Sequence, residues 1–148
     1  MNPTMTSQPN PLLQKQHAQQ YQEQQITTAS KEQLLIMLYD GAIRFCKVAK
    51  KAMQEGNIEK SNHHLIRAQR IIMEFMGSLD IEVGGETAKQ LFVLYEYLHH
   101  QLVQANVQKD TALIDEVLEH LASLRQTWVV AIEITKQEQS HKNRPSQA

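Results

Sequence analysis

Histidines and carboxylates are the residues of this chain whose types and spacing could do chemistry. Glu96 and His99 have the i, i+3 spacing that di-iron carboxylate bundles place on an inward helix face. Such a site also needs a second pair of this kind and two more inward carboxylates on facing helices. Glu116, Glu119 and His120 lie near one another but at other spacings. We therefore expect solvated helix faces here, no metal site and no cofactor.

The sequence gives equally weak evidence for two other kinds of catalytic site. Phosphotransfer bundles expose one histidine that is followed by a small residue and a lysine. His63 and His64 are followed instead by Leu65, Ile66 and Arg67. The Gly84-Gly85 pair lacks the strand and lysine of a phosphate-binding loop and is more typical of a turn. The sequence predicts neither an enzyme nor a small-molecule substrate.

Composition narrows the remaining classes of function. The 148 residues include 15 Lys and Arg against 16 Asp and Glu, with the signs mixed along the chain, so we expect no nucleic-acid partner. No run reaches the roughly 18 apolar residues of a membrane span, and we expect no direct membrane insertion. Cys46, the single cysteine, lies in an apolar stretch and is typical of a small buried hydrophobe in a reducing compartment. These features predict a cytoplasmic protein.

The helix that begins after Ser30 is the most informative element. Ser30 and Gln33 form the pattern of a capping box, and Gly56 is a helix-ending residue. Residues 34–38 are five consecutive apolar side chains, which point in every direction around a helix. Either the chain itself covers all of these faces, or part of the apolar surface is left for a partner.

Three further helices complete the expected fold. The first and the last follow the caps Asn57 and Asp110, and the middle one begins near Glu86, whose charge suits the start of a helix. These helices end near residues 79, 106 and 136. Because the connections are short, consecutive helices must run antiparallel. The sequence predicts an all-α protein: an antiparallel four-helix bundle over residues 26–137, with a flexible Gln/Pro-rich tail over residues 1–25 and a disordered C-terminus over residues 138–148.

Single residues in these helices allow two interpretations. Asp40 could anchor a partner's backbone or bind within its own chain. Gly41, inside a helix, indicates close approach of another backbone, either internal or incoming. Tyr95 and Tyr97 lie on two faces of one helix, so we expect at least one ring to be exposed.

An ordered set of short motifs resembles one known family, the flagellar secretion chaperones called FliS. The resemblance spans residues 21–130 and is carried by Tyr21, Ile26, Thr28-Ala29-Ser30, Leu38-Tyr39-Asp40-Gly41-Ala42, Leu79-Asp80, Gly84-Gly85-Glu86, Leu94-Tyr95-x-Tyr97, Ala105-Asn106, Asp110 and Trp128. It implies a four-helix bundle with no catalytic role. It also implies binding of the disordered C-terminal segment of flagellin in the cytoplasm, a block on premature polymerisation, and delivery to the export gate protein of the flagellar type III secretion system.

The resemblance and the surplus apolar surface together suggest a partner-binding site. We expect Tyr21 and Ile26 to occupy a groove between bundle helices when flagellin is absent. The residues expected at the covered end of that groove are Leu34, Met37, Leu38 and Tyr39, with Ile71, Leu91 and Tyr95 as further candidates. The alternative is a non-enzymatic helical adaptor that homodimerises through its spare apolar face.

Overall fold

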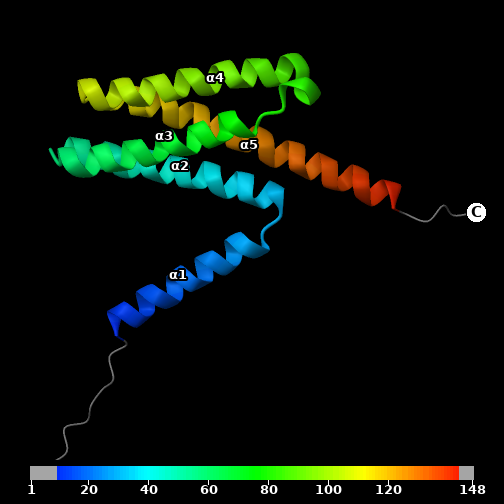
Figure 1. Ribbon diagram of the computed structural model, residues 1–148, viewed down its shortest axis with the longest axis horizontal. Helices are drawn as coiled ribbons and strands as arrows, with labels where there is room; N and C mark the ends of the chain where they lie inside the picture. The colour runs from blue at the N-terminus through cyan, green and yellow to red at the C-terminus, as the bar shows by residue number, and fades with distance from the viewer. Residues whose placement is uncertain (1–9, 144–148) are drawn as a thin grey trace, which may run out of the picture. The chain divides into compact units, whose positions relative to one another are not determined.

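The computed structural model describes residues 10–143, apart from the side chains of residues 21–28, and this part of the chain is helical without strands. The chain divides into two compact units at Leu34. The first unit contains α1 (Pro11–Thr28), and the second contains α3, α4, α5 and all but the first turn of α2 (Figure 1). Within the described residues, none of the helices is long and apolar enough to cross a membrane.

Helix α1 corrects the expectation that residues 1–25 lack regular structure. It begins at Pro11, after Asn10 accepts a hydrogen bond from the Leu12 amide at 3.0 Å. Proline at the first helical position and a sequence rich in Gln favour a helix locally. Residues 10–20 are all exposed, so no burial of side chains supports this part of the helix. The expectation considered only burial and neglected local propensity. Residues 1–9 lie outside the described part.

Helices α2 (Lys31–Gln54) and α3 (Ile58–Ser78) begin and end as the sequence predicts. The Gln33 amide donates to Ser30 Oγ at 3.2 Å and the Ser30 amide to Gln33 Oε1 at 3.0 Å, which is the expected capping box. Gly56 has φ of 75°, the left-handed conformation that glycine adopts without strain. Asn57 then caps α3 by accepting from the Lys60 amide.

Helix α4 (Ile81–Gln108) has a kink where the sequence predicted a loop. Gly85 has φ 56° and ψ −134°, a conformation essentially restricted to glycine. The single turn before it was not predicted, and it is capped by the Asp80 side chain. A Cβ on Gly84 would lie 2.6 Å from that of Ala88. The two glycines thus serve different needs, close packing at Gly84 and backbone conformation at Gly85.

Helix α5 (Thr111–Lys142) begins after the predicted cap Asp110 but ends later than predicted. We expected the helix to fray after Lys136 and residues 138–148 to be disordered. The helix instead continues through Lys142, fully exposed over its last turns. Gln, Glu and Lys are good helix formers, and no breaker precedes Pro145. Residues 144–148 lie outside the described part.

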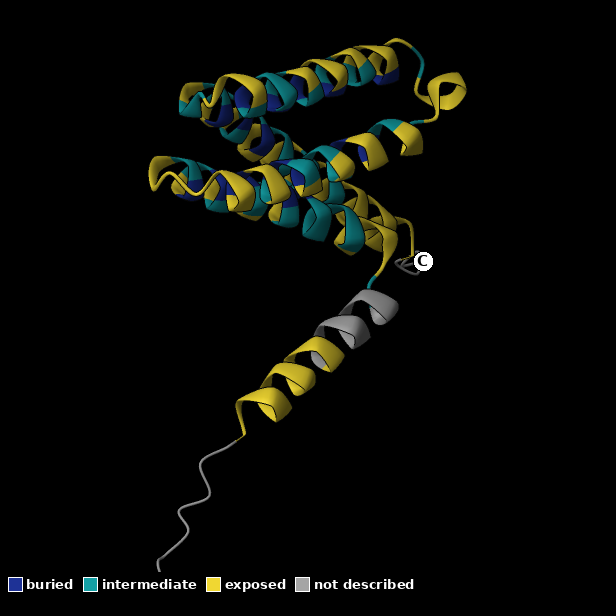
Figure 2. Cartoon of the chain, turned by 60° about the vertical axis from the view of Figure 1, so that its left-hand side comes forward, coloured by how far each residue is buried: buried dark blue, intermediate teal, exposed yellow. Residues whose placement is uncertain are grey.

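Side-chain contacts join α2, α3, α4 and α5 into the predicted bundle. Phe45 of α2 contacts His64 of α3, and the Asn106 side chain of α4 donates to Asn62 of α3 at 2.5 Å. Two ion pairs, Lys50–Asp115 and Asp40–Arg125, join α2 to α5 in antiparallel register. The buried residues lie on the faces that the four helices turn toward one another (Figure 2).

Candidate functional site

Four aromatic residues, one from each bundle helix, meet at one end of the core. Tyr39 stacks on Phe75 with ring centroids 4.4 Å apart, and Phe75 lies 5.3 Å from Tyr95. The Tyr39 and Tyr95 hydroxyl oxygens are 2.5 Å apart, and Trp128 Nε1 donates to the Tyr39 hydroxyl at 3.1 Å. We call these four residues the aromatic centre.

Burial of the aromatic centre changes the chemistry of its hydroxyls. Burial raises the pKa of Tyr39 well above its usual value, and the hydrogen bond to Tyr95 adds to the effect. Burial likewise raises the pKa of Tyr95. Both phenols are therefore neutral at every physiological pH and act as structural hydrogen-bonding groups. Burial also raises the pKa of the Cys46 thiol, to about 12, so this thiol is protonated and unreactive.

Two predicted partner-binding residues belong to this centre and not to a surface. Tyr39 is fully buried and Tyr95 is 2 % exposed. A partner could reach either ring only if the four helices separated. We correct the expectation for both residues: helical spacing alone could not tell an inward tyrosine from an outward one.

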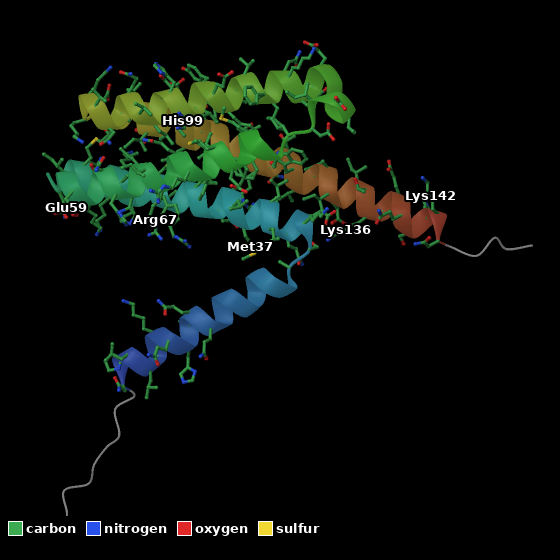
Figure 3. All side chains as sticks on the ribbon, viewed as in Figure 1. Met37, Glu59, Arg67, His99, Lys136 and Lys142 are labelled. Carbon is green, nitrogen blue, oxygen red and sulfur yellow. The ribbon has the colours of Figure 1, made fainter. Side chains whose placement is uncertain are left out.

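The other predicted residues lie between core and solvent. Leu38, Ile71 and Leu91 are half-buried and pack against the core, so they expose only an edge. Leu34 and Met37 are half-buried on α2, and Figure 3 labels Met37 there. Met37 is the predicted residue of the bundle that best fits a surface role. The side chains of Tyr21 and Ile26 lie outside the described residues.

The structure decides between the two interpretations that the sequence allowed for Asp40, Gly41 and Tyr97. Asp40 binds Arg125 of α5, with its Oδ1 2.6 Å from the arginine Nε, so the anchor of this carboxylate is within its own chain. A Cβ on Gly41 would meet Ile71 Cδ1 at 3.4 Å, and no backbone atom of another helix lies within 4 Å. The expectation that Gly41 permits close backbone approach was therefore wrong. Tyr97 is 43 % exposed, as expected for one ring of its pair.

An apolar surface that the sequence analysis did not identify follows the boundary between α3 and α4. The Asn62–Asn106 hydrogen bond fixes which side of each helix turns to the other. Steps of three or four residues from these two positions continue the same sides along both antiparallel helices. We call the apolar residues on these sides the α3–α4 strip: Ile66, Met73 and Met76 of α3, and Phe92 and Val103 of α4.

The strip is apolar but not enclosed by the chain. Met73 is 56 % exposed, and the other four side chains are half-buried. Gln69 of α3 and His99 of α4 are polar residues on these same sides, and Figure 3 labels His99 on the side of α4 that turns toward α3. Grouped apolar side chains of this kind are typical of protein-interaction surfaces.

A sequence signal for the strip was available. Residues 71–73 and 91–94 are uninterrupted apolar runs in helices whose core face needs only every third or fourth residue. The same argument identified surplus apolar surface on the first bundle helix. Applied to these two runs, it would have predicted Met73 and Phe92.

Polar residues on α4 and α5 form hydrogen bonds with each other and leave no metal site. Glu116 accepts hydrogen bonds from Tyr97 and Gln101; the one from Tyr97 lowers the pKa of Glu116 most and raises that of Tyr97. In the part of the chain that the structure describes, no three His, Cys, Asp or Glu side chains could hold a metal ion. Glu138 and His141, a second pair with the spacing of Glu96 and His99 that the sequence analysis overlooked, are exposed on the last turns of α5.

The fold and surface define a class: a four-helix bundle with a closed core that keeps apolar side chains on its exterior. A model of the family described as "Flagellar protein FliS" matches residues 14–135. This chain belongs to the FliS family.

Relatives support this assignment over most of their length. The flagellar secretion chaperone FliS of Bacillus subtilis is 34% identical over 113 residues, which cover 76% of this chain and 84% of the relative. FliS of Salmonella typhimurium is 35% identical over 115 residues, which cover 77% of this chain and 85% of the relative. A crystal structure of a bacterial flagellar chaperone matches the fold with a TM-score of 0.66 at 21% identity, covering 81% of this chain and 98% of that one.

Proposed function

We propose that this chain is a cytoplasmic export chaperone for flagellin. It binds the disordered C-terminal segment of flagellin, prevents premature polymerisation and helps deliver the subunit to the export gate of the flagellar type III secretion system. Membership of a family of flagellar secretion chaperones supports a secreted flagellar client. The choice of flagellin, of its C-terminal segment and of the gate is our proposal.

The observation that carries the proposal is the apolar surface outside a complete core. The aromatic centre already joins all four helices, so the α3–α4 strip is not needed to close the bundle. A disordered client loses conformational entropy when it is ordered, and it recovers that free energy by burying apolar side chains over a long contact. Half-exposed residues on α2, α3 and α4 offer such a contact.

We propose two contact regions. One is the α3–α4 strip, and the other is the side of α2 that carries Met37, one of the residues expected from the sequence to contact the partner. Leu34, Leu38, Ile71 and Leu91 stay candidates for partial contact through their exposed edges.

We retain the hypothesis that residues before α2 compete with the client. A tethered segment acts at an effective concentration near millimolar, so even weak apolar contacts by Tyr21 and Ile26 would compete. Deletion of residues 1–27 is expected to strengthen flagellin binding and to increase binding of an apolar dye. If affinity and dye binding stay the same, this competition does not occur.

The testing experiment is calorimetric titration of the full chain with the C-terminal segment of flagellin from the same organism. Light scattering counts the chains in each species. We expect a one-to-one complex with a strongly negative heat-capacity change, because the client buries apolar surface as it becomes ordered. An N-terminal flagellin segment of similar length and charge is the matched control.

The adaptor alternative predicts a different result. If the chain dimerises without flagellin and does not bind the segment, the exterior apolar surface is a homodimer contact and the chaperone proposal fails.

A further inference from the structure

A second exterior surface, distinct in chemistry from the apolar strip, follows α3. A shallow hollow runs along this helix, and its lining includes Glu59, Lys60, His63, Ile66, Arg67 and Arg70. We call it the α3 hollow. It borders the α3–α4 strip at Ile66 but is otherwise polar and basic.

The hollow lies in the positively charged half of the chain. Residues 31–78 contain eight Lys and Arg against five Asp and Glu, whereas residues 80–143 contain five against ten. The near-zero net charge therefore hides a separation into a basic α2–α3 pair and an acidic α4–α5 pair. Because both signs occur within every bundle helix, this division was not predicted from the sequence.

The cations of the hollow have no acidic partners that would neutralise them. Among the described side chains, ion pairs join Lys50 to Asp115 and Asp40 to Arg125, and neither pair involves α3. Lys60 and Arg70 are exposed. Glu59 is the acidic residue of the lining, so the surface keeps a positive charge.

One of these cations is held in place before any partner binds. The Arg67 guanidinium lies 4.7 Å from the centroid of the Phe45 ring, and Arg44 lies 5.4 Å from the same ring. Contact with the ring face restrains a guanidinium while its N–H groups stay available. The adjacent His64 is fixed as well, because its Nδ1 lies 2.9 Å from the Lys60 carbonyl oxygen.

We propose that the α3 hollow binds an acidic helical or extended segment of a partner protein. The lining extends from Asn57 to Arg70, about 20 Å along a helix, which suits a peptide and exceeds a small anion. The apolar Ile66 between its basic residues favours a peptide that carries an aliphatic side chain between carboxylates over a continuous phosphate chain. This inference does not depend on flagellin being the client.

The test uses two fluorescent peptides of about 14 residues, the length that matches the hollow. One repeats Leu-Glu-Glu-Ala and the other has Gln in place of every Glu. Binding to the full chain is measured by fluorescence anisotropy across a salt series. We expect the acidic peptide to bind, to weaken as salt rises, and to bind more than tenfold tighter than the Gln peptide.

Two double variants locate the site. Lys60→Glu with Arg70→Glu reverses two of the positive charges of the hollow. Lys136→Glu with Lys142→Glu changes the net charge by the same amount but on the exposed end of α5 (Figure 3). Because each reversal replaces an attraction by a repulsion, the first variant should bind the acidic peptide about tenfold more weakly. The second should change affinity less than about twofold, because both lysines lie on the C-terminal end of α5, away from Glu59 and Arg67 of the hollow (Figure 3).

Several results would overturn the proposal. These are equal binding of the two peptides, equal losses in the two double variants, or no binding of the acidic peptide. Binding of phosphatidylserine vesicles that the Lys60 and Arg70 reversals abolish, without peptide binding, would assign the hollow to a membrane instead. Thermal melts of both variants verify that a loss of binding does not reflect unfolding.

Discussion

The aromatic centre and the α3–α4 strip use similar residues for opposite purposes. In the centre, the side chains of four helices enclose one another, and the buried hydroxyls and indole N–H bond to each other. On the strip, the apolar side chains keep an open side, with Met73 56 % exposed. Apolar surface that a fold encloses stabilises the fold, and apolar surface that it leaves open is available to a partner.

The difference between enclosed and open side chains distinguishes structural residues from candidate contact residues. Residue type alone cannot make this distinction. Tyr39 was predicted to contact a partner and is structural, while Met73 was not predicted and is a candidate contact. If the comparison is correct, substitutions in the centre change the free energy of unfolding, and substitutions on the strip change client affinity.

The largest expected effect is that of Tyr39→Ala. Removing a fully buried aromatic ring from the junction of four helices should lower the free energy of unfolding by about 3–5 kcal/mol. Urea denaturation followed by circular dichroism measures this change. A loss below about 1 kcal/mol would mean that the aromatic centre does not hold the bundle together.

Removing single hydroxyls from the centre should have graded effects. Tyr39→Phe breaks the bonds to both Tyr95 and Trp128 and leaves these two polar groups only each other as partners, which should cost about 2 kcal/mol. Tyr95→Phe breaks one bond and should cost about 1 kcal/mol. Urea denaturation of both variants tests the order, and equal losses would show that the Trp128 bond contributes nothing.

On the strip, Met73→Ser should separate binding from stability. We expect affinity for the flagellin segment to fall by about five- to twentyfold, because an exposed apolar contact is lost. The free energy of unfolding should change by less than about 0.5 kcal/mol. Val130→Ser, a substitution of an exposed apolar residue on α5, is the control and should leave affinity unchanged.

Gly41, which lies against Ile71 at the edge of the core, should tolerate a larger side chain. Its Cβ would meet only Ile71 Cδ1, at ordinary contact distance, and alanine is the better helix former. We expect Gly41→Ala to raise the free energy of unfolding by up to about 1 kcal/mol. Gly85→Ala should do the reverse, because the backbone of Gly85 disfavours any Cβ. Destabilisation by Gly41→Ala would instead support a packing role for this glycine.

The smallest expected effect is that of Glu116→Gln, at an exposed hydrogen bond between α4 and α5. The pKa of Glu116 is lowered in the folded protein, so its stabilising contribution is present above the unfolded-state pKa of about 4.3. That contribution disappears as the pH falls through the lower, folded-state pKa. Melting curves from pH 7 to pH 3 should therefore converge for the variant and the original chain. Curves that diverge toward low pH would contradict this sign.

Local signals in the sequence were sufficient for most of the fold. Ser30 with Gln33, Asn57 and Asp110 mark helix starts through bonds between residues a few positions apart, which a sequence displays directly. Short connections then required an antiparallel bundle. The C-terminal limit of α5 and the helix α1 were missed because propensity alone can maintain an exposed helix where no packing is required.

The candidate surface was less predictable for a physical reason. Whether Tyr39 or Met37 points outward depends on which helices flank α2, and that follows from packing between residues distant in the chain. The core contacts of α2, such as Tyr39 with Phe75 of α3 and Tyr95 of α4, join residues far apart in the sequence, so no local pattern predicts them. The surplus of apolar residues was visible in the sequence, but their direction was not.

The most direct test uses the methionine methyl groups as reporters in NMR spectra. Met37 and Met73 lie on the two proposed contact regions, and Met53 packs against the core. On addition of the flagellin C-terminal segment, the account predicts large shifts for Met73 and Met37, with Met53 unchanged. Shifts that are largest at Met53, or absent at Met73 in a formed complex, would contradict the assignment of core and contact surface.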